Sequence, residues 1–119
     1  MFQRKNLIFL FLFFLAALSV FPQNLFTGIW VCEEEWDGVP VKDYFTFYND
    51  GTGLWSLEDG KDSDSFTYTA GVSTITMKWN NSGEITVYDF IFGSDGSLVL
   101  GIDFGSGEGY KKYVYFRVK

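Results

Sequence analysis

The chain contains no histidine and only one cysteine. Without an imidazole it lacks the commonest general base, every Ser-His triad and most transition-metal sites. Cys32 has no histidine partner, which excludes a papain-like nucleophile. One cysteine cannot form an intrachain disulfide either, so the hydrophobic core must stabilise the fold by itself.

Basic residues and prolines are also scarce. Nine Lys and Arg stand against fifteen Asp and Glu, for a net charge of −6, and there are two prolines. A chain without a basic cluster is not expected to bind nucleic acid or anionic lipid surfaces. Aromatic residues make up 21% of the sequence, which argues against disorder because such side chains drive burial.

The N-terminus has the pattern of a secretory leader. Arg4 and Lys5 precede an uninterrupted apolar run over Leu7–Leu18. A basic segment before a short apolar segment is typical of a signal peptide, and the run is too short to span a bilayer comfortably. An uncleaved N-terminal membrane anchor is the alternative.

Cleavage is expected between Ser19 and Gln23, which divides the chain into a signal peptide over 1–22 and one small domain over 23–119. The mature domain is two charges more negative, because the leader removes two basic residues. It is expected to be secreted or periplasmic, without stable membrane insertion after cleavage.

Cys32 does not fit a lipid-anchoring site. A lipobox needs a small residue directly before the cysteine, and here Trp30 and Val31 precede it, well beyond the apolar run. We therefore expect no lipidation at Cys32, and a thiol that packs in a strand as a small hydrophobe. A monomer is expected, with a disulfide-linked dimer as the alternative.

The rest of the chain alternates between strand-forming and turn-forming residues. Asp-Gly pairs such as Asp37-Gly38 and Asp50-Gly51 tolerate the positive φ of tight hairpins. Runs rich in Val, Ile, Thr, Tyr, Phe and Trp lie between them, and no helical period appears. The predicted strands are 26–35, 41–49, 52–58, 64–71, 73–79, 84–92, 97–104 and 110–118.

Closely spaced strands with hairpin turns predict a sequential antiparallel meander. Closing such a meander removes its aggregation-prone edges, so the predicted fold is all-β, an eight-stranded up-and-down barrel. Its interior is either filled by side chains or left open for one small ligand. The residues predicted to form the core are Phe45, Phe47, Trp79 and Phe116.

The pattern Gly28-x-Trp30 on the first strand, with Arg117 near the end of the last, resembles the small bacterial lipocalin-like, or calycin-type, barrels. The resemblance implies that Arg117 lies over the indole of Trp30 at the closed end. First and last strands must pair to close a barrel, so the contact is also physically reasonable. The chain is shorter than the larger lipocalins and lacks their disulfide pair and their helix after the last strand.

No arrangement in the sequence predicts catalysis or a metal centre. Glu33, Glu34 and Glu35 are consecutive, so Glu34 faces away from its two neighbours, and no second group supplies a separate acid or base role. The acidic segment with Asp62 and Asp64 fails the calcium-loop pattern. We expect no enzymatic activity, no cofactor and no bound metal.

The surplus of aromatic residues is the remaining functional signal. It favours a protein that binds a small hydrophobic or amphipathic ligand in the barrel or at its mouth. The alternative is a periplasmic or surface module, an inhibitor or adhesin-like accessory, that contacts a protein partner through an outer aromatic face. The residues predicted to contact the ligand are Tyr44, Tyr48, Trp55, Tyr68, Tyr88 and Tyr113.

Overall fold

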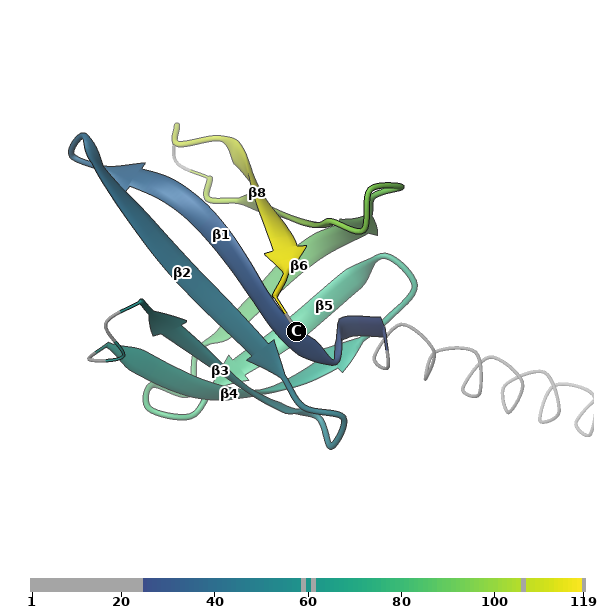
Figure 1. The fold of residues 1–119 in the computed structure, drawn as a ribbon. Coiled ribbons are helices and arrows are strands. Elements are labelled where there is room, and N and C mark those ends of the chain that lie inside the picture. Colours follow the sequence, from purple (N-terminus) through teal and green to yellow (C-terminus); the bar gives the residue numbers. More distant parts are fainter. Residues whose placement is uncertain (1–24, 59, 61, 106, 119) are drawn as a thin grey trace, which may run out of the picture.

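The computed structural model describes residues 25–58, 60, 62–105 and 107–118. They form one closed antiparallel barrel in which each strand pairs with the next and the last pairs with the first (Figure 1), as predicted. The predicted signal peptide over 1–22 lies outside the described residues. Within them no helix is long and apolar enough to cross a membrane. The strands are β1 (Gly28–Trp36), β2 (Val39–Phe47), β3 (Thr52–Leu57), β4 (Ser63–Ala70), β5 (Thr74–Trp79), β6 (Ile85–Phe92), β7 (Leu98–Asp103) and β8 (Tyr110–Arg117).

Turn chemistry fixes the strand boundaries, and each lies within two residues of its predicted position. The β1–β2 hairpin shows why. Asp37 and Gly38 connect its strands with φ values of 53° and 79°. Two successive positive φ angles match the right-handed twist of the flanking strands, and Asp-Gly is a favoured pair for this geometry.

β1 and β8 close the barrel through a short ladder that pairs Trp30 with Arg117 and Val31 with Phe116. The guanidinium carbon of Arg117 lies 4.2 Å from the centre of the Trp30 ring. The same guanidinium donates hydrogen bonds to the carbonyl oxygens of Thr27 (2.6 Å) and Leu25 (2.9 Å). The predicted contact between Trp30 and Arg117 is confirmed, and we call this set of interactions the Arg117 clasp.

The first residue of the Gly-x-Trp pattern has its own structural role. Gly28 opens β1 with a φ of 136°, in a region that residues with a Cβ rarely adopt. Trp30 follows on the inner face, where its indole Nε1 donates to the carbonyl oxygen of Phe26 at 2.8 Å. Glycine therefore lets the chain turn into the first strand while the indole stays in the core.

Aromatic rings fill the end of the barrel beneath the clasp. Phe26, just before β1, is fully buried and packs against rings from three strands at centroid distances from 4.8 to 6.4 Å. Edge-to-face and tilted contacts of this kind suit the ring quadrupoles. This end is therefore solid, and we call it the closed end. The rings around Phe26 are Phe47, Tyr68, Phe90 and Phe92.

The core prediction is correct for β2 and wrong for β8. Phe45 and Phe47 are buried. Phe116, also predicted to be in the core, is 51% exposed, whereas its neighbour Tyr115 is 3% exposed. The register gives the reason: Arg117 lies opposite Trp30, which points inward, so the odd-numbered residues of β8 share the inner face and Phe116 points out.

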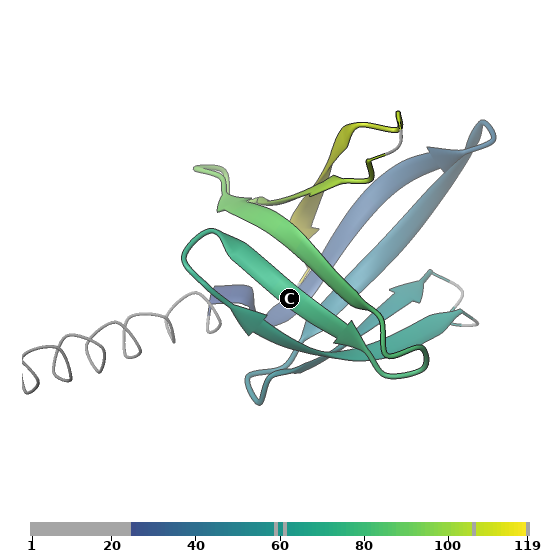
Figure 2. The same cartoon turned by 180° about the vertical axis from the view of Figure 1, so that it is seen from behind.

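The other end of the barrel carries the β1–β2, β3–β4, β5–β6 and β7–β8 turns, and we call it the open end. The long β1–β2 hairpin projects there beyond the neighbouring strands in both views (Figures 1 and 2). Trp79, a predicted core residue at the end of β5, is only partly buried, because it lies towards this end.

Replacing the guanidinium tests the clasp. Arg117→Met keeps the aliphatic stem but loses the cation–π contact and both hydrogen bonds, so we expect the free energy of unfolding to fall by about 1–2 kcal/mol. Arg117→Lys keeps the charge but loses the planar guanidinium that donates both hydrogen bonds, so its free energy of unfolding should lie between those of wild type and Arg117→Met. Urea unfolding measures the difference, and equal stability of wild type and Arg117→Met would contradict the role of the clasp.

Candidate functional site

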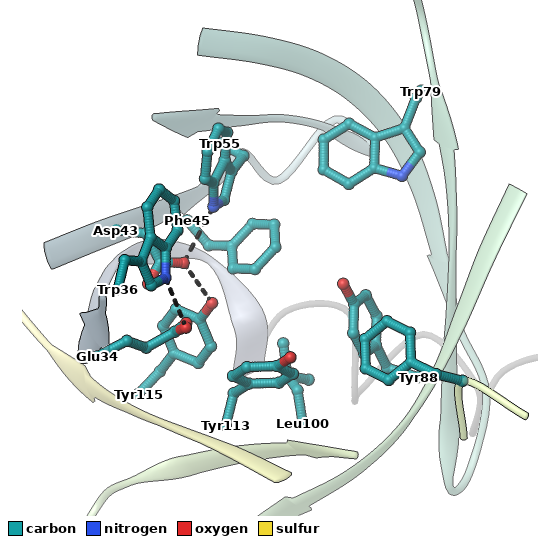
Figure 3. Close-up of a pocket in the computed structure, with 11 residues that line it drawn as sticks. Glu34, Trp36, Asp43, Phe45, Trp55, Trp79, Tyr88, Leu100, Tyr113 and Tyr115 are labelled. Carbon is teal, nitrogen blue, oxygen red and sulfur yellow. Dashed lines mark hydrogen bonds between the residues drawn. The ribbon is translucent and has the colours of Figure 1, made fainter. Parts of the chain in front are cut away.

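A cavity of about 410 Å³ occupies the open end of the barrel (Figure 3). Aromatic side chains make up most of its wall, and its charged residues are both acidic. In Figure 3, Glu34, Trp36 and Asp43 lie on one side of the cavity and Tyr88 on the other. The lining residues are Glu34, Trp36, Asp43, Phe45, Trp55, Trp79, Tyr88, Leu100, Phe104, Tyr113 and Tyr115.

Strand alternation aims these side chains inward. On β1, Trp30 lies in the core, so Glu34 and Trp36 share its face at intervals of two residues. On β2 the same rule places Asp43 in phase with the buried Phe45. Both acidic residues therefore lie on the core-facing side of their strands, but nearer the open end than the packed core.

Asp43 is the polar centre of the cavity wall. Its side chain is only 4% exposed. One carboxylate oxygen, Oδ2, accepts hydrogen bonds from the indole Nε1 of Trp55 at 3.0 Å and from the hydroxyl of Tyr115 at 2.6 Å. Burial and the nearby Asp43 carboxylate raise the pKa of Tyr115, which keeps that hydroxyl protonated as a donor.

Glu34 lies beside Asp43 and is half-buried. Its Oε2 accepts a hydrogen bond from the indole Nε1 of Trp36 at 3.2 Å. Burial raises the pKa of the Glu34 carboxyl, and the neighbouring Asp43 raises it further, although the Trp36 hydrogen bond opposes this. The surroundings of Glu34 therefore oppose its ionisation.

Cys32 lies close to the carboxyl groups of Glu34 and Asp43. Its thiol is buried, as predicted, and its sulfur lies 4.0 Å from Oε1 of Glu34. One ligand atom each from Cys32, Glu34 and Asp43 falls within a 4.8 Å cluster. Burial and the two carboxylates raise the pKa of the thiol to about 12. The thiol is therefore protonated at neutral pH.

A second hollow of about 790 Å³ lies along the outer side of the barrel, and we call it the seam groove. The β1–β8 ladder ends at Val31, so the two strands diverge towards the open end. Side chains of β1, β2 and β8 line the hollow between them. Glu34 and Tyr113 line both this groove and the cavity, so the two spaces meet at these residues.

Three of the six residues predicted to contact a ligand lie together in the cavity wall. They are Trp55 on β3, Tyr88 on β6 and Tyr113 on β8. Burial raises the pKa of Tyr88 to about 12, and burial also raises the pKa of Tyr113, so both hydroxyls are neutral. No hydrogen bond to either hydroxyl is found among the described residues, which leaves both available to a bound molecule.

The other three predicted residues lie elsewhere. Tyr44 points outward and lines the seam groove. Tyr48 is half-exposed in the turn after β2, at the closed end. Tyr68 is buried at that end, and its hydroxyl donates to the backbone carbonyl of Tyr48 at 2.7 Å. The structure does not bring these three together with the cavity residues, and a binding role for all six stays a prediction.

Sequence reasoning did not select Glu34, Trp36, Asp43 or Phe104 as site residues. A signal for two of them was present. Asp43 is in phase with Phe45 and Phe47, and Glu34 is in phase with Trp30. A carboxylate on the core face of a strand indicates a polar group inside the barrel. Phe104 follows β7 in a loop, and no strand periodicity predicts its direction.

In comparisons with known proteins, the chain matches no protein-family model and no curated protein. The fold and the geometry of the cavity are therefore the basis for inferring function.

The thiol of Cys32 provides a chemical test of this geometry. A rise in pKa from 9.0 to about 12, combined with burial, should slow alkylation by iodoacetamide at pH 8 about a thousandfold relative to the urea-unfolded chain. Mass spectrometry of timed samples gives both rates. Rapid alkylation of the folded protein would show that the thiol is exposed and ionised.

Proposed function

We propose that the chain is a non-enzymatic, lipocalin-like binding protein that holds one small hydrophobic or amphipathic ligand at the open end of its barrel. The observation that carries the proposal is the contrast between the two ends. Aromatic rings fill the closed end, whereas the open end keeps a cavity of about 410 Å³. Ligand sites span roughly 300–1,000 Å³ and combine apolar walls with a few polar groups.

The Arg117 clasp supports the lipocalin-like part of the proposal. Gly28, Trp30 and Arg117 take the positions that the resemblance implies, with the guanidinium over the indole. A closed end sealed in this way leaves one route into the interior from the barrel axis, and the cavity lies at that opposite end.

The geometry of the carboxyl pair supports binding rather than catalysis. Glu34 and Asp43 each place an oxygen within 4.8 Å of the other, in a wall whose remaining lining residues are aromatic or apolar. Asp43 is also engaged by two donors, which suits a fixed polar wall. A binding site needs only such pre-oriented groups.

Export is part of the same proposal and rests on the leader pattern of residues 1–22. We expect the full chain, expressed in a Gram-negative host, to appear in the periplasmic fraction with its mass reduced by cleavage between Ser19 and Gln23. Intact-protein mass spectrometry of the fractions checks both points. Full-length protein that stays with the cytoplasm or the membranes would contradict export.

The alternative, a protein-interaction module, is supported by one observation. Exposed apolar side chains line the seam groove beside Tyr44 of β2: Val114 and Phe116 of β8, and Val118 directly after this strand. Exposed apolar side chains gathered in one groove are typical of contact surfaces. The two functions use opposite faces of β8, so variants on these faces separate them.

The neutral dye N-phenyl-1-naphthylamine tests the binding proposal. We expect it to fluoresce in the wild-type cavity and to bind about fivefold more weakly to Trp36→Ala, which removes one aromatic wall. Trp36 is 45% exposed, so its truncation leaves the core intact. Phe116→Ala is the matched control, since Phe116 is similarly exposed but faces away from the cavity. Fluorescence titration gives the three dissociation constants.

Each outcome of the titration decides between the two functions. Selective weakening in Trp36→Ala supports the cavity. Selective weakening in Phe116→Ala places the dye in the seam groove and contradicts the cavity proposal. A wild-type protein that takes up no dye contradicts it as well and favours the protein-interaction module.

A further inference from the structure

The polar groups of the cavity have one electrostatic character. The charged residues that line it, Glu34 and Asp43, are both acidic, and the hydroxyls of Tyr88 and Tyr113, which have no hydrogen-bond partner among the described residues, add neutral polar groups. The donors that engage the two carboxylates are neutral: two indole N–H groups and one phenol. No ion pair to either carboxylate is found among the described residues. Among these residues the pair therefore has no cationic partner.

The aromatic walls of the cavity also favour a positively charged ligand. Trp36, Trp55 and Trp79 present indole rings to the cavity, and the faces of aromatic rings carry partial negative charge. A cation near such faces, out of bulk water, gains up to about 2 kcal/mol per contact. One such contact is present within the protein: Nζ of the Lys111 side chain lies 5.3 Å from the centre of the ring of Phe104, which lines the cavity.

Crowding of the carboxyl groups strengthens the preference for a cation. Burial and the Asp43 carboxylate oppose the ionisation of Glu34, and the Trp36 hydrogen bond and the charge of Lys111 offset this only in part, so the pKa of Glu34 is raised. A positive charge placed between the two carboxyl groups would favour their doubly ionised state. An anionic ligand would meet repulsion from both groups and from the rings.

Resting on the function proposed above, we infer that the ligand of this cavity is a small organic cation: an ammonium group on an apolar or aromatic body. Glu34 and Asp43 receive the ammonium, and Trp36, Trp55 and Trp79 cover its charge and its body. A bare inorganic cation would leave the indole walls unused, whereas a neutral apolar molecule would cover the two carboxyl groups without supplying a positive charge.

Three nearly isosteric probes test the charge of the ligand: 2-phenylethylamine, 2-phenylethanol and phenylacetate. We expect the amine to bind at least about tenfold more tightly than the alcohol, and phenylacetate to bind weakest. Isothermal titration calorimetry and displacement of N-phenyl-1-naphthylamine give the affinities at neutral pH.

Adjacent glutamates on β1 provide matched variants. Glu34→Gln removes the charge that faces the cavity, and Glu35→Gln removes the same charge from an exposed position that does not line it. We expect Glu34→Gln to bind the amine about tenfold more weakly, with the alcohol unchanged, and Glu35→Gln to match wild type within about twofold. Because ionised Glu34 is unfavourable here, Glu34→Gln should fold at least as stably as wild type, which thermal unfolding checks.

The outcomes separate this inference from the function on which it rests. Equal affinity for the amine and the alcohol overturns the cation inference and leaves ligand binding intact, as does a cavity that binds the dye but none of the three probes. Equal loss of amine affinity in Glu34→Gln and Glu35→Gln also overturns it, since the effect then reflects net charge alone. Failure of the dye and of all three probes to bind overturns both.

Discussion

The contacts of Arg117 stabilise the closure of the barrel between its first and last strands. Arg117 reaches from the last strand to the ring of Trp30 and to two carbonyl oxygens that precede β1. The ladder between β1 and β8 is only two residue pairs long, and a hydrogen bond from the Val118 N–H to the carbonyl oxygen of Ile29 (2.7 Å) extends it. The side chain of Arg117 adds contacts to this short ladder, whose register determines which residues of β1 and β8 face inward. The composition of the cavity follows from this closure.

The high aromatic content has two structural uses in one small domain. At the closed end, rings around Phe26 fill the interior without a disulfide. At the open end, Trp36, Trp55 and Trp79 border space instead of filling it, and their indole N–H groups bind Glu34, Asp43 and Thr86. Because each indole is tied to a polar partner, the wall is fixed before any ligand arrives.

The architecture was predictable because local signals agree: Asp-Gly turns, period-two strands and the Trp30–Arg117 pair all require a closed meander. Phe116 was misplaced because β8 carries apolar or aromatic residues on both faces, so its alternation is ambiguous. The Trp30–Arg117 pair resolves it, since it places odd-numbered residues of β8 inside. Asp43 and Glu34 were overlooked because charge normally indicates solvent. That two carboxyl groups and three indoles meet around one space depends on side-chain packing across the barrel, which no single strand encodes.

The short β1–β8 ladder has a consequence for solubility. Beyond Val31 the described residues of β1 and β8 form no ladder with each other, and exposed strand edges invite pairing with strands of other molecules. Charged side chains stand at this slit: Glu33 on β1, Lys42 on β2 and Lys112 on β8. An incoming strand would have to desolvate these charges. Charged side chains at an exposed strand edge disfavour such pairing.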